Sequence, residues 1–183
     1  MFKLIAFAVL SACLISISWG SLHTPRSHGF YRFFAWEFIL ALFLLDVDYW
    51  FDDPFSFHQI IAWLMLILSA ILVIAGVRLL REIGKPDRAR KDDSATIAFE
   101  KTTTLVEVGA YKYIRHPLYS SLLFLTWGIF FKAPAWQGGI LALMATIFLV
   151  ATAKVEEGEN IRFFGAAYRA YVERTKLFVP FVF

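Results

Sequence analysis

Five long apolar runs constrain this chain more than any other feature of its sequence. A transmembrane helix needs about 20 predominantly apolar residues to cross a bilayer. Runs that approach this length occupy most of the 183 residues, at 4–19, 31–50, 59–80, 118–131 and 136–153. The chain is 59% hydrophobic, whereas soluble domains hold roughly 45–50% apolar residues. We therefore expect an all-α, polytopic membrane protein of about five transmembrane helices, with residues 1–183 forming a single domain.

The first apolar run has an alternative interpretation as a cleaved signal. Lys3 precedes it, and the four residues that end at Cys13 resemble a lipoprotein cleavage site. The run continues past that point to Trp19, which favours a membrane helix. Because Cys13 is the only cysteine, the sequence predicts no internal disulfide and no metal site built on cysteines.

The basic residues predict how the chain is oriented in the membrane. With five spans, 16 of the 18 Lys and Arg residues fall on one face, and only Lys3 and Lys132 fall on the other. The positive-inside rule then places the amino terminus outside and the carboxyl terminus in the cytoplasm. We expect a bacterial inner membrane or another membrane that faces the cytoplasm. The basic charge is interpreted as contact with anionic membrane lipids, and no nucleic-acid partner is expected.

Connections between the runs carry most of the remaining charge. Asp46 and Asp48 lie near the outer end of the second run, before Asp52, Asp53 and Pro54, and this pattern predicts an exterior turn rather than a buried acidic site. The connection 82–113 begins with alternating charges and is expected to be a solvated cytoplasmic loop or surface helix. Its second half, 102–111, is apolar enough to pack onto the protein.

The last two apolar runs are predicted to form a helical hairpin. Only residues 132–135 join them, so the helices must be antiparallel neighbours. This arrangement brings residues 115–119 to the same membrane surface as residues 154–157. Pro117 suits the first position of a helix, and the amides before it are expected to be free. A structural role for His116 is the alternative.

The tail after this hairpin carries two adjacent carboxylates. Glu157 continues an apolar stripe of helical spacing through Phe164 and Tyr168, whereas Glu156 aligns with Asn160 on a neighbouring face. Gly165 indicates a close backbone approach. Spacing alone leaves open that both acids are solvated and pair with nearby basic residues.

These motifs together resemble a known family. The order of a tyrosine at 111, Arg-His-Pro-x-Tyr at 115–119, Glu156-Glu157 and Phe-Gly-x-x-Tyr at 164–168 is similar to that of the isoprenylcysteine carboxyl methyltransferase and phospholipid methyltransferase group. The resemblance is strongest over 102–180. It implies a membrane enzyme that uses S-adenosylmethionine from the cytoplasm to methylate a lipid-borne or hydrophobic acceptor, with a cofactor pocket built by a cytoplasmic loop and a carboxyl-terminal helix.

The resemblance also implies roles for individual residues. The expected cofactor-binding residues are Leu105, Val106, Tyr111, His116, Pro117, Leu118, Tyr119 and Glu156. Glu157 and His116 are the candidates for a catalytic base, and Lys154 and Arg174 are candidates for binding an anionic acceptor. Thr152 stands where prenylcysteine enzymes have an arginine, so recognition of a prenylcysteine carboxylate is not implied.

Two other functions remain open from the sequence. A nicotinamide-dependent membrane reductase of the sterol-reductase type has a similar carboxyl-terminal half, and a non-enzymatic membrane scaffold could keep the motifs for packing. The sequence does not distinguish a carboxylate, an amine or a thiol as methyl acceptor. It leaves the oligomeric state open.

Overall fold

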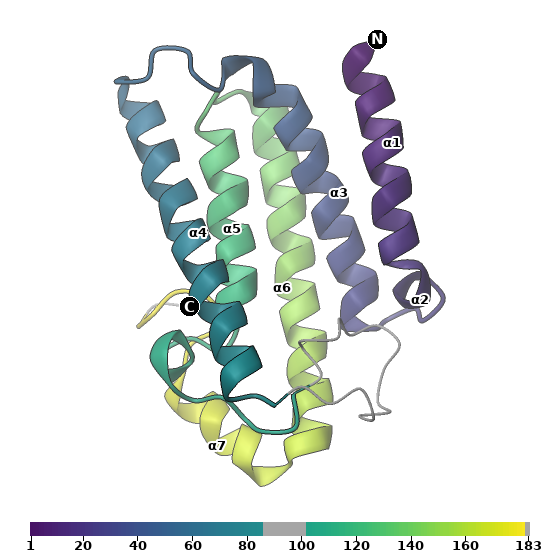
Figure 1. Cartoon of the computed structure of the whole chain (residues 1–183), viewed down its shortest axis with the longest axis vertical. Helices are drawn as coiled ribbons and strands as arrows, with labels where there is room; N and C mark the ends of the chain where they lie inside the picture. The colour runs from purple at the N-terminus through teal and green to yellow at the C-terminus, as the bar shows by residue number, and fades with distance from the viewer. Residues whose placement is uncertain (86–101, 182–183) are drawn as a thin grey trace.

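The computed structural model describes residues 1–85 and 102–181, and this part of the chain is all-α (Figure 1). The described helices are α1 (Phe2–Ile17), α2 (Trp19–Leu22), α3 (His28–Asp46), α4 (Phe57–Glu82), α5 (Pro117–Phe130), α6 (Trp136–Phe164) and α7 (Ala166–Arg174). Two short 3₁₀ turns, η1 (Val47–Tyr49) and η2 (Gly109–Lys112), lie in the connections. All five predicted apolar runs are helical, which confirms the all-α prediction.

Two of the described helices, α4 and α6, are long and apolar enough to cross a membrane. The apolar helices α1 and α5 are shorter. Large apolar side chains of α4 and α6 point away from the bundle and are exposed, among them Ile60, Leu64, Ile67, Ile71, Ile140, Leu143 and Ile147. Exposed apolar surface of this extent is typical of a lipid-facing surface rather than a water-facing one.

The long helices form a bundle in which α3 packs mainly on α6 and α4 mainly on α5. Two glycines allow the close approach of α4 and α5, as small residues do at membrane-helix interfaces. A Cβ at Gly76 would lie 2.8 Å from the Leu118 side chain, and one at Gly128 would lie 3.0 Å from Leu66.

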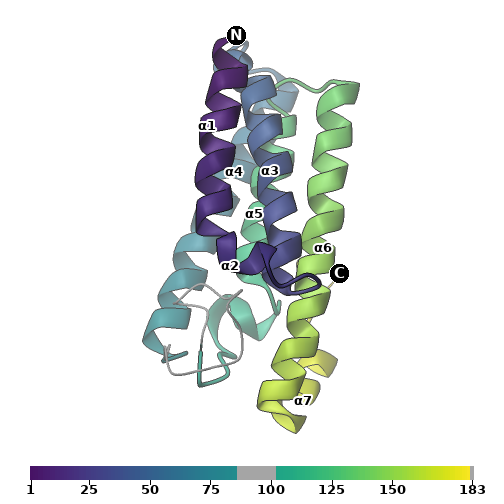
Figure 2. The same cartoon turned by 90° about the vertical axis from the view of Figure 1, so that its right-hand side faces the viewer.

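The connections are divided between the two ends of the bundle. The start of α1, the α3–α4 connection and the α5–α6 connection lie at one end, whereas α7 and the start of α5 lie at the other (Figures 1 and 2). Because α5 and α6 are antiparallel neighbours, the predicted hairpin is present. The charged first half of the connection 82–113 falls largely on residues 86–101, outside the described part of the chain.

The expectation of an exterior position was wrong for Asp46. Asp48 is exposed and pairs with Lys3 at 2.7 Å, but Asp46 is only 2% exposed. Its Oδ2 has no hydrogen-bond partner among the described residues. The reason is that α3 continues through Asp46, so this side chain faces the start of α6, where a Cβ at Gly138 would lie 3.7 Å from Oδ2.

The tail also differs from its predicted form. The apolar stripe suggested one continuous helix past Phe164, but α6 ends there and α7 begins at Ala166. Gly165 between them has φ 61° and ψ −129°, a conformation open chiefly to glycine. Among the described residues other than its chain neighbours, none lies within 4 Å of a Cβ at Gly165. Gly165 therefore serves a turn and not the predicted close approach.

Candidate active site

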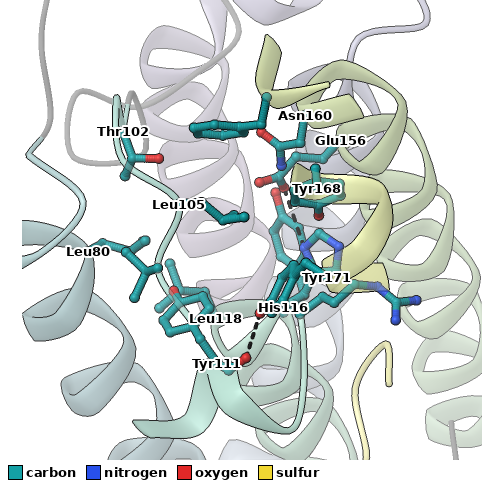
Figure 3. Close-up of a pocket in the computed structure, with 14 residues that line it drawn as sticks. Leu80, Thr102, Leu105, Tyr111, His116, Leu118, Glu156, Asn160, Tyr168 and Tyr171 are labelled. Atoms are coloured by element: carbon teal, nitrogen blue, oxygen red, sulfur yellow. Dashed lines mark hydrogen bonds and ion pairs between the residues drawn. The ribbon is translucent and has the colours of Figure 1, made fainter. Parts of the chain in front are cut away.

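A pocket lies where the end of α4, the loop before α5, the start of α5, the end of α6 and α7 converge (Figure 3). Counting open solvent at its mouth, it has about 590 Å³ of empty space, within the roughly 300–1,000 Å³ of small-molecule sites. The loop is held against α4 because the amides of Thr103 and Thr104 both donate to the Gly84 carbonyl, at 3.0 and 3.1 Å. The lining residues are Leu80, Thr102, Leu105, Val106, Tyr111, Arg115, His116, Leu118, Tyr119, Glu156, Asn160, Phe164, Tyr168 and Tyr171.

Seven of the eight residues expected to bind cofactor line this pocket. They are Leu105, Val106, Tyr111, His116, Leu118, Tyr119 and Glu156. The eighth, Pro117, is fully buried as the first residue of α5 and does not line the pocket. Three further predicted residues, Glu157, Lys154 and Arg174, also lie outside the lining.

Several lining residues were absent from the predicted site. Asn160 and Phe164 follow Glu156 on one face of α6, at four and eight residues' distance, and this spacing could have identified them. Tyr168 and Tyr171 reach the pocket only because the chain turns at Gly165. Leu80 and Thr102 are adjacent to no motif, and the sequence carries no signal for them.

Glu157 belongs to an ion-pair network beside the pocket. The Arg115 Nε donates to Glu157 Oε1, and the Lys154 Nζ donates to Glu157 Oε2 at 2.9 Å. The Arg115 Nη1 also donates to the carbonyls of Val172, at 3.2 Å, and Thr175. Arg174 pairs instead with Glu107, at 2.6 Å. The network therefore joins the start of α5 to α6 and to the end of α7.

His116 is a buried polar group of the pocket, with 5% of its surface exposed. Its Nδ1 is 3.9 Å from a Glu156 oxygen and its Nε2 is 3.9 Å from a Glu157 oxygen. Both distances are too long for a hydrogen bond, and Nε2 has no partner among the described residues. Burial lowers the pKa of His116, although the two carboxylates oppose this effect. A neutral imidazole with an unsatisfied nitrogen is therefore available to a ligand.

Backbone amides next to His116 are not free, contrary to expectation. The Arg115 amide donates to Lys176 O at 2.8 Å, and the His116 amide donates to Leu177 O at 3.3 Å. The Ser120 hydroxyl donates to Phe178 O at 2.8 Å. Residues 175–181 thus run beside the start of α5 and accept hydrogen bonds from the amides that the sequence predicted to be free.

Tyrosines form much of the remaining wall (Figure 3). The Tyr171 hydroxyl donates to Tyr111 O at 2.7 Å and so ties α7 to the loop. Tyr119 is hydrogen-bonded to Glu156, and its ring stacks on His116 with 5.4 Å between centroids. Burial raises the pKa of both Tyr168 and Tyr171, so these phenols stay neutral. The pocket combines aromatic faces, one accessible carboxylate and one neutral imidazole.

Comparison with known proteins places this pocket in a family context. The chain is similar to two Bradyrhizobium diazoefficiens proteins, methanethiol S-methyltransferase 1 (32% identity over 72 residues) and methanethiol S-methyltransferase 2 (35% over 75 residues). It is also similar to the methanethiol S-methyltransferase of Pseudomonas deceptionensis, with 31% identity over 72 residues. These alignments cover 38–40% of this chain and 24–27% of the relatives, so the matched part is about a quarter of their length.

No solved structure matches the chain. The pattern of the phospholipid methyltransferase family matches residues 57–167, a range that begins with α4 and ends in the first residues of α7. It contains most of the pocket lining. Because this match extends over more than half of the chain, the protein belongs to the phospholipid methyltransferase family, a family of S-adenosylmethionine-dependent membrane methyltransferases.

Proposed function

We propose that this protein is an integral membrane enzyme that transfers the methyl group of S-adenosylmethionine to a hydrophobic acceptor, with a small thiol as the favoured acceptor. The observation that carries the proposal is the convergence of seven predicted cofactor residues on one pocket. The names of the three relatives support a thiol.

The residues present fit S-adenosylmethionine. The Glu156 carboxylate, whose side chain is 25% exposed, suits the cofactor's positive charges or its ribose hydroxyls. The unsatisfied Nε2 of His116 offers one polar contact. Tyrosine rings can cover the adenine or the cationic sulfur. When bound, the cofactor supplies a methyl group activated by a positively charged sulfur.

Methyl transfer requires few catalytic groups from the protein. In a direct displacement the acceptor sulfur gains a bond to the methyl carbon, the bond from that carbon to the cofactor sulfur breaks, and S-adenosylhomocysteine leaves. The pocket must align the two reactants and exclude water. A thiol also loses its proton, and His116 is the better placed base because it is neutral and unpaired, whereas both oxygens of Glu157 are in ion pairs.

Charge around the pocket favours a neutral acceptor over an anionic one. Lys154 and Arg174 were the candidates for an anionic group, and each already pairs with a glutamate, Glu157 and Glu107 respectively. Neither lines the pocket. Binding a carboxylate there would require these pairs to break, whereas a neutral thiol needs no counter-charge.

For the membrane orientation, we propose five spans with the pocket on the cytoplasmic side. All of the described basic residues outside Lys3 and Lys132 lie toward the α7 end of the bundle or in the loops beside it. Under the positive-inside rule this end faces the cytoplasm, where S-adenosylmethionine is available.

Calorimetry on the detergent-solubilised protein tests the proposal. Wild type is expected to bind S-adenosylmethionine and S-adenosylhomocysteine with a Kd on the order of micromolar, and Glu156→Gln or His116→Ala should weaken binding about tenfold or more because each removes a charge-assisted or buried contact. Glu82→Gln and His23→Ala are matched controls, since both positions lie away from the pocket lining.

The acceptor is tested by turnover with a small alkyl thiol, an amine and a carboxylic acid of equal chain length. Methylation of the thiol alone supports the proposal, and methylation of either other compound replaces the thiol assignment. If folded wild type binds reduced nicotinamide cofactor and not S-adenosylmethionine, the reductase interpretation holds. If it binds neither, the scaffold interpretation holds.

A further inference from the structure

The amino-terminal end of α3 lies against the part of α6 that carries Glu156. His28 and Arg32 are four residues apart and therefore share one face of α3, and they are only 2% and 4% exposed. Both precede residues 57–167, the range that the family pattern matches. Their burial beside a pocket carboxylate needs an explanation, because charged side chains are rarely buried unless they have partners.

His28 is fixed to α6 by Glu159. The His28 Nδ1 lies 2.5 Å from Glu159 Oε2, and the His28 amide donates to Glu159 Oε1 at 3.3 Å. The Glu159 carboxylate thus binds the start of α3, where the helix dipole also favours a negative charge. Glu159 directly precedes Asn160 and comes one turn after Glu156. Its contact with His28 therefore fixes the position of the start of α3 along α6, beside the pocket.

Electrostatic interactions link the same two residues to the pocket carboxylate. The His116 ring would attract Glu156 only when protonated, whereas His28 and Arg32 attract it from α3. Arg32 is held with its guanidinium 5.0 Å from the centre of the Trp36 ring. Removing a carboxylate from water is costly unless opposite charges compensate it. Because the His116 ring is neutral, α3 supplies the compensating charge through His28 and Arg32.

We propose that His28 and Arg32 are positioning residues for Glu156, which hold its carboxylate ionised and oriented toward S-adenosylmethionine, while Glu159 holds His28 in place. This inference rests on the proposed function. It assigns the amino-terminal part of the chain a role in cofactor binding, in addition to the family-matched part.

Double-substitution analysis in the full-length, detergent-solubilised protein tests this role. The substitutions Arg32→Gln and His28→Gln are made in wild type and in Glu156→Gln, and the Kd of S-adenosylmethionine and S-adenosylhomocysteine is measured with ligand up to millimolar concentration. Arg32→Lys, which keeps the charge, is the rescue variant. Arg78→Gln is the matched control, since Arg78 lies outside the pocket lining and forms an exposed pair with Glu82. If Arg32→Gln does not fold, the analysis proceeds with His28→Gln.

In wild type, each substitution is expected to weaken binding of both ligands about fivefold or more. In Glu156→Gln the loss should be less than about twofold, since groups that interact electrostatically are energetically coupled. Arg32→Lys should recover most of the loss. An equal loss in both backgrounds, or binding within about twofold of wild type, would overturn the inference. A gain in affinity for S-adenosylmethionine but not for S-adenosylhomocysteine would also overturn the inference. It would show only that a positive charge repelling the cationic sulfur had been removed.

These outcomes differ from a failure of the proposed function. If wild type itself does not bind either ligand, the cofactor assignment fails first. If wild type binds and the coupling is absent, only the role of α3 is wrong.

Discussion

His116 shows how burial and neighbouring charge compete at a single residue. Glu156 and Glu157 each lie 3.9 Å from one of its ring nitrogens, and carboxylates at that distance favour a protonated imidazole. Burial has the opposite and larger effect, so the pKa of His116 is lowered from its ordinary value of 6.5. At neutral pH the ring is therefore uncharged, which is the state that a proton acceptor requires.

This lowered pKa predicts how stability depends on pH. Between the folded and unfolded pKa values the unfolded chain binds the extra proton, so His116 makes the folded state less stable as pH falls below about 6.5 and has no such effect above it. We expect the unfolding temperature of wild type to fall more steeply with acid than that of His116→Gln, measured over about pH 5 to 8. Identical pH profiles for the two proteins would contradict this assignment.

The turn between α6 and α7 governs which side chains of the tail can reach the pocket. Through the φ of 61° at Gly165, the chain reverses direction enough for Tyr168 and Tyr171 to line the same pocket as Glu156 and Asn160. The Tyr171 hydroxyl then ties this short helix to the loop before α5. A nine-residue helix such as α7 is only marginally stable by itself, so its position depends on these attachments.

Paired glycine substitutions test the importance of this turn. Gly165→Ala should lower the free energy of unfolding by about 1–3 kcal/mol, because a side chain at this φ and ψ strains the backbone. Gly158→Ala is the control within the last two turns of α6, where no described residue outside the local helix backbone lies within 4 Å of the new Cβ. It should raise stability by about 0.5–1 kcal/mol. Thermal unfolding in detergent measures both, and equal effects of the two substitutions would contradict the argument.

The elements differ in how well the sequence predicted them. Apolar runs located the five long helices because lipid-facing and buried residues are both apolar, and the short 132–135 connection predicted the hairpin of α5 and α6. Helical periodicity could not detect a break of one residue at Gly165, since the apolar spacing continues across it. The contact of His28 with Glu159 joins positions that are 131 residues apart in the sequence. No local sequence pattern predicts a contact between residues so far apart. For the pocket, the motifs identified seven lining residues, and the structure added seven others from α4, the segment before α5, α6 and α7.

At the scale of the whole molecule, the two ends of the bundle have different chemistry. One end carries the pocket and most of the described basic side chains, and the other carries the start of α1 with Asp46, Asp48 and Asp52 (Figure 1). This asymmetry is the physical basis of the proposed orientation, since anionic lipids and the insertion machinery retain basic loops on the cytoplasmic side.

Single-cysteine labelling tests the orientation. In a Cys13→Ser background, Asp52→Cys should react with a membrane-impermeant thiol reagent on intact cells, whereas Glu173→Cys should react only after the membrane is opened, because the two exposed positions lie at opposite ends of the bundle. Labelling is measured by a mass shift. The reverse pattern would show the opposite orientation, and labelling of both positions in intact cells would exclude five spans.

Residues 175–181 determine how late in synthesis the start of α5 gains its contacts with the tail. Their carbonyls accept hydrogen bonds from Arg115, His116 and Ser120, and Leu177 and Phe178 are buried at 3% and 1% exposure. A ribosome makes this segment after the described helices, about sixty residues later than His116. The bundle can thus insert into the membrane before these contacts support the pocket residues Arg115 and His116. Nascent chains therefore acquire this support for the pocket only once residues 175–181 have been made, and a product that stops short of them lacks it.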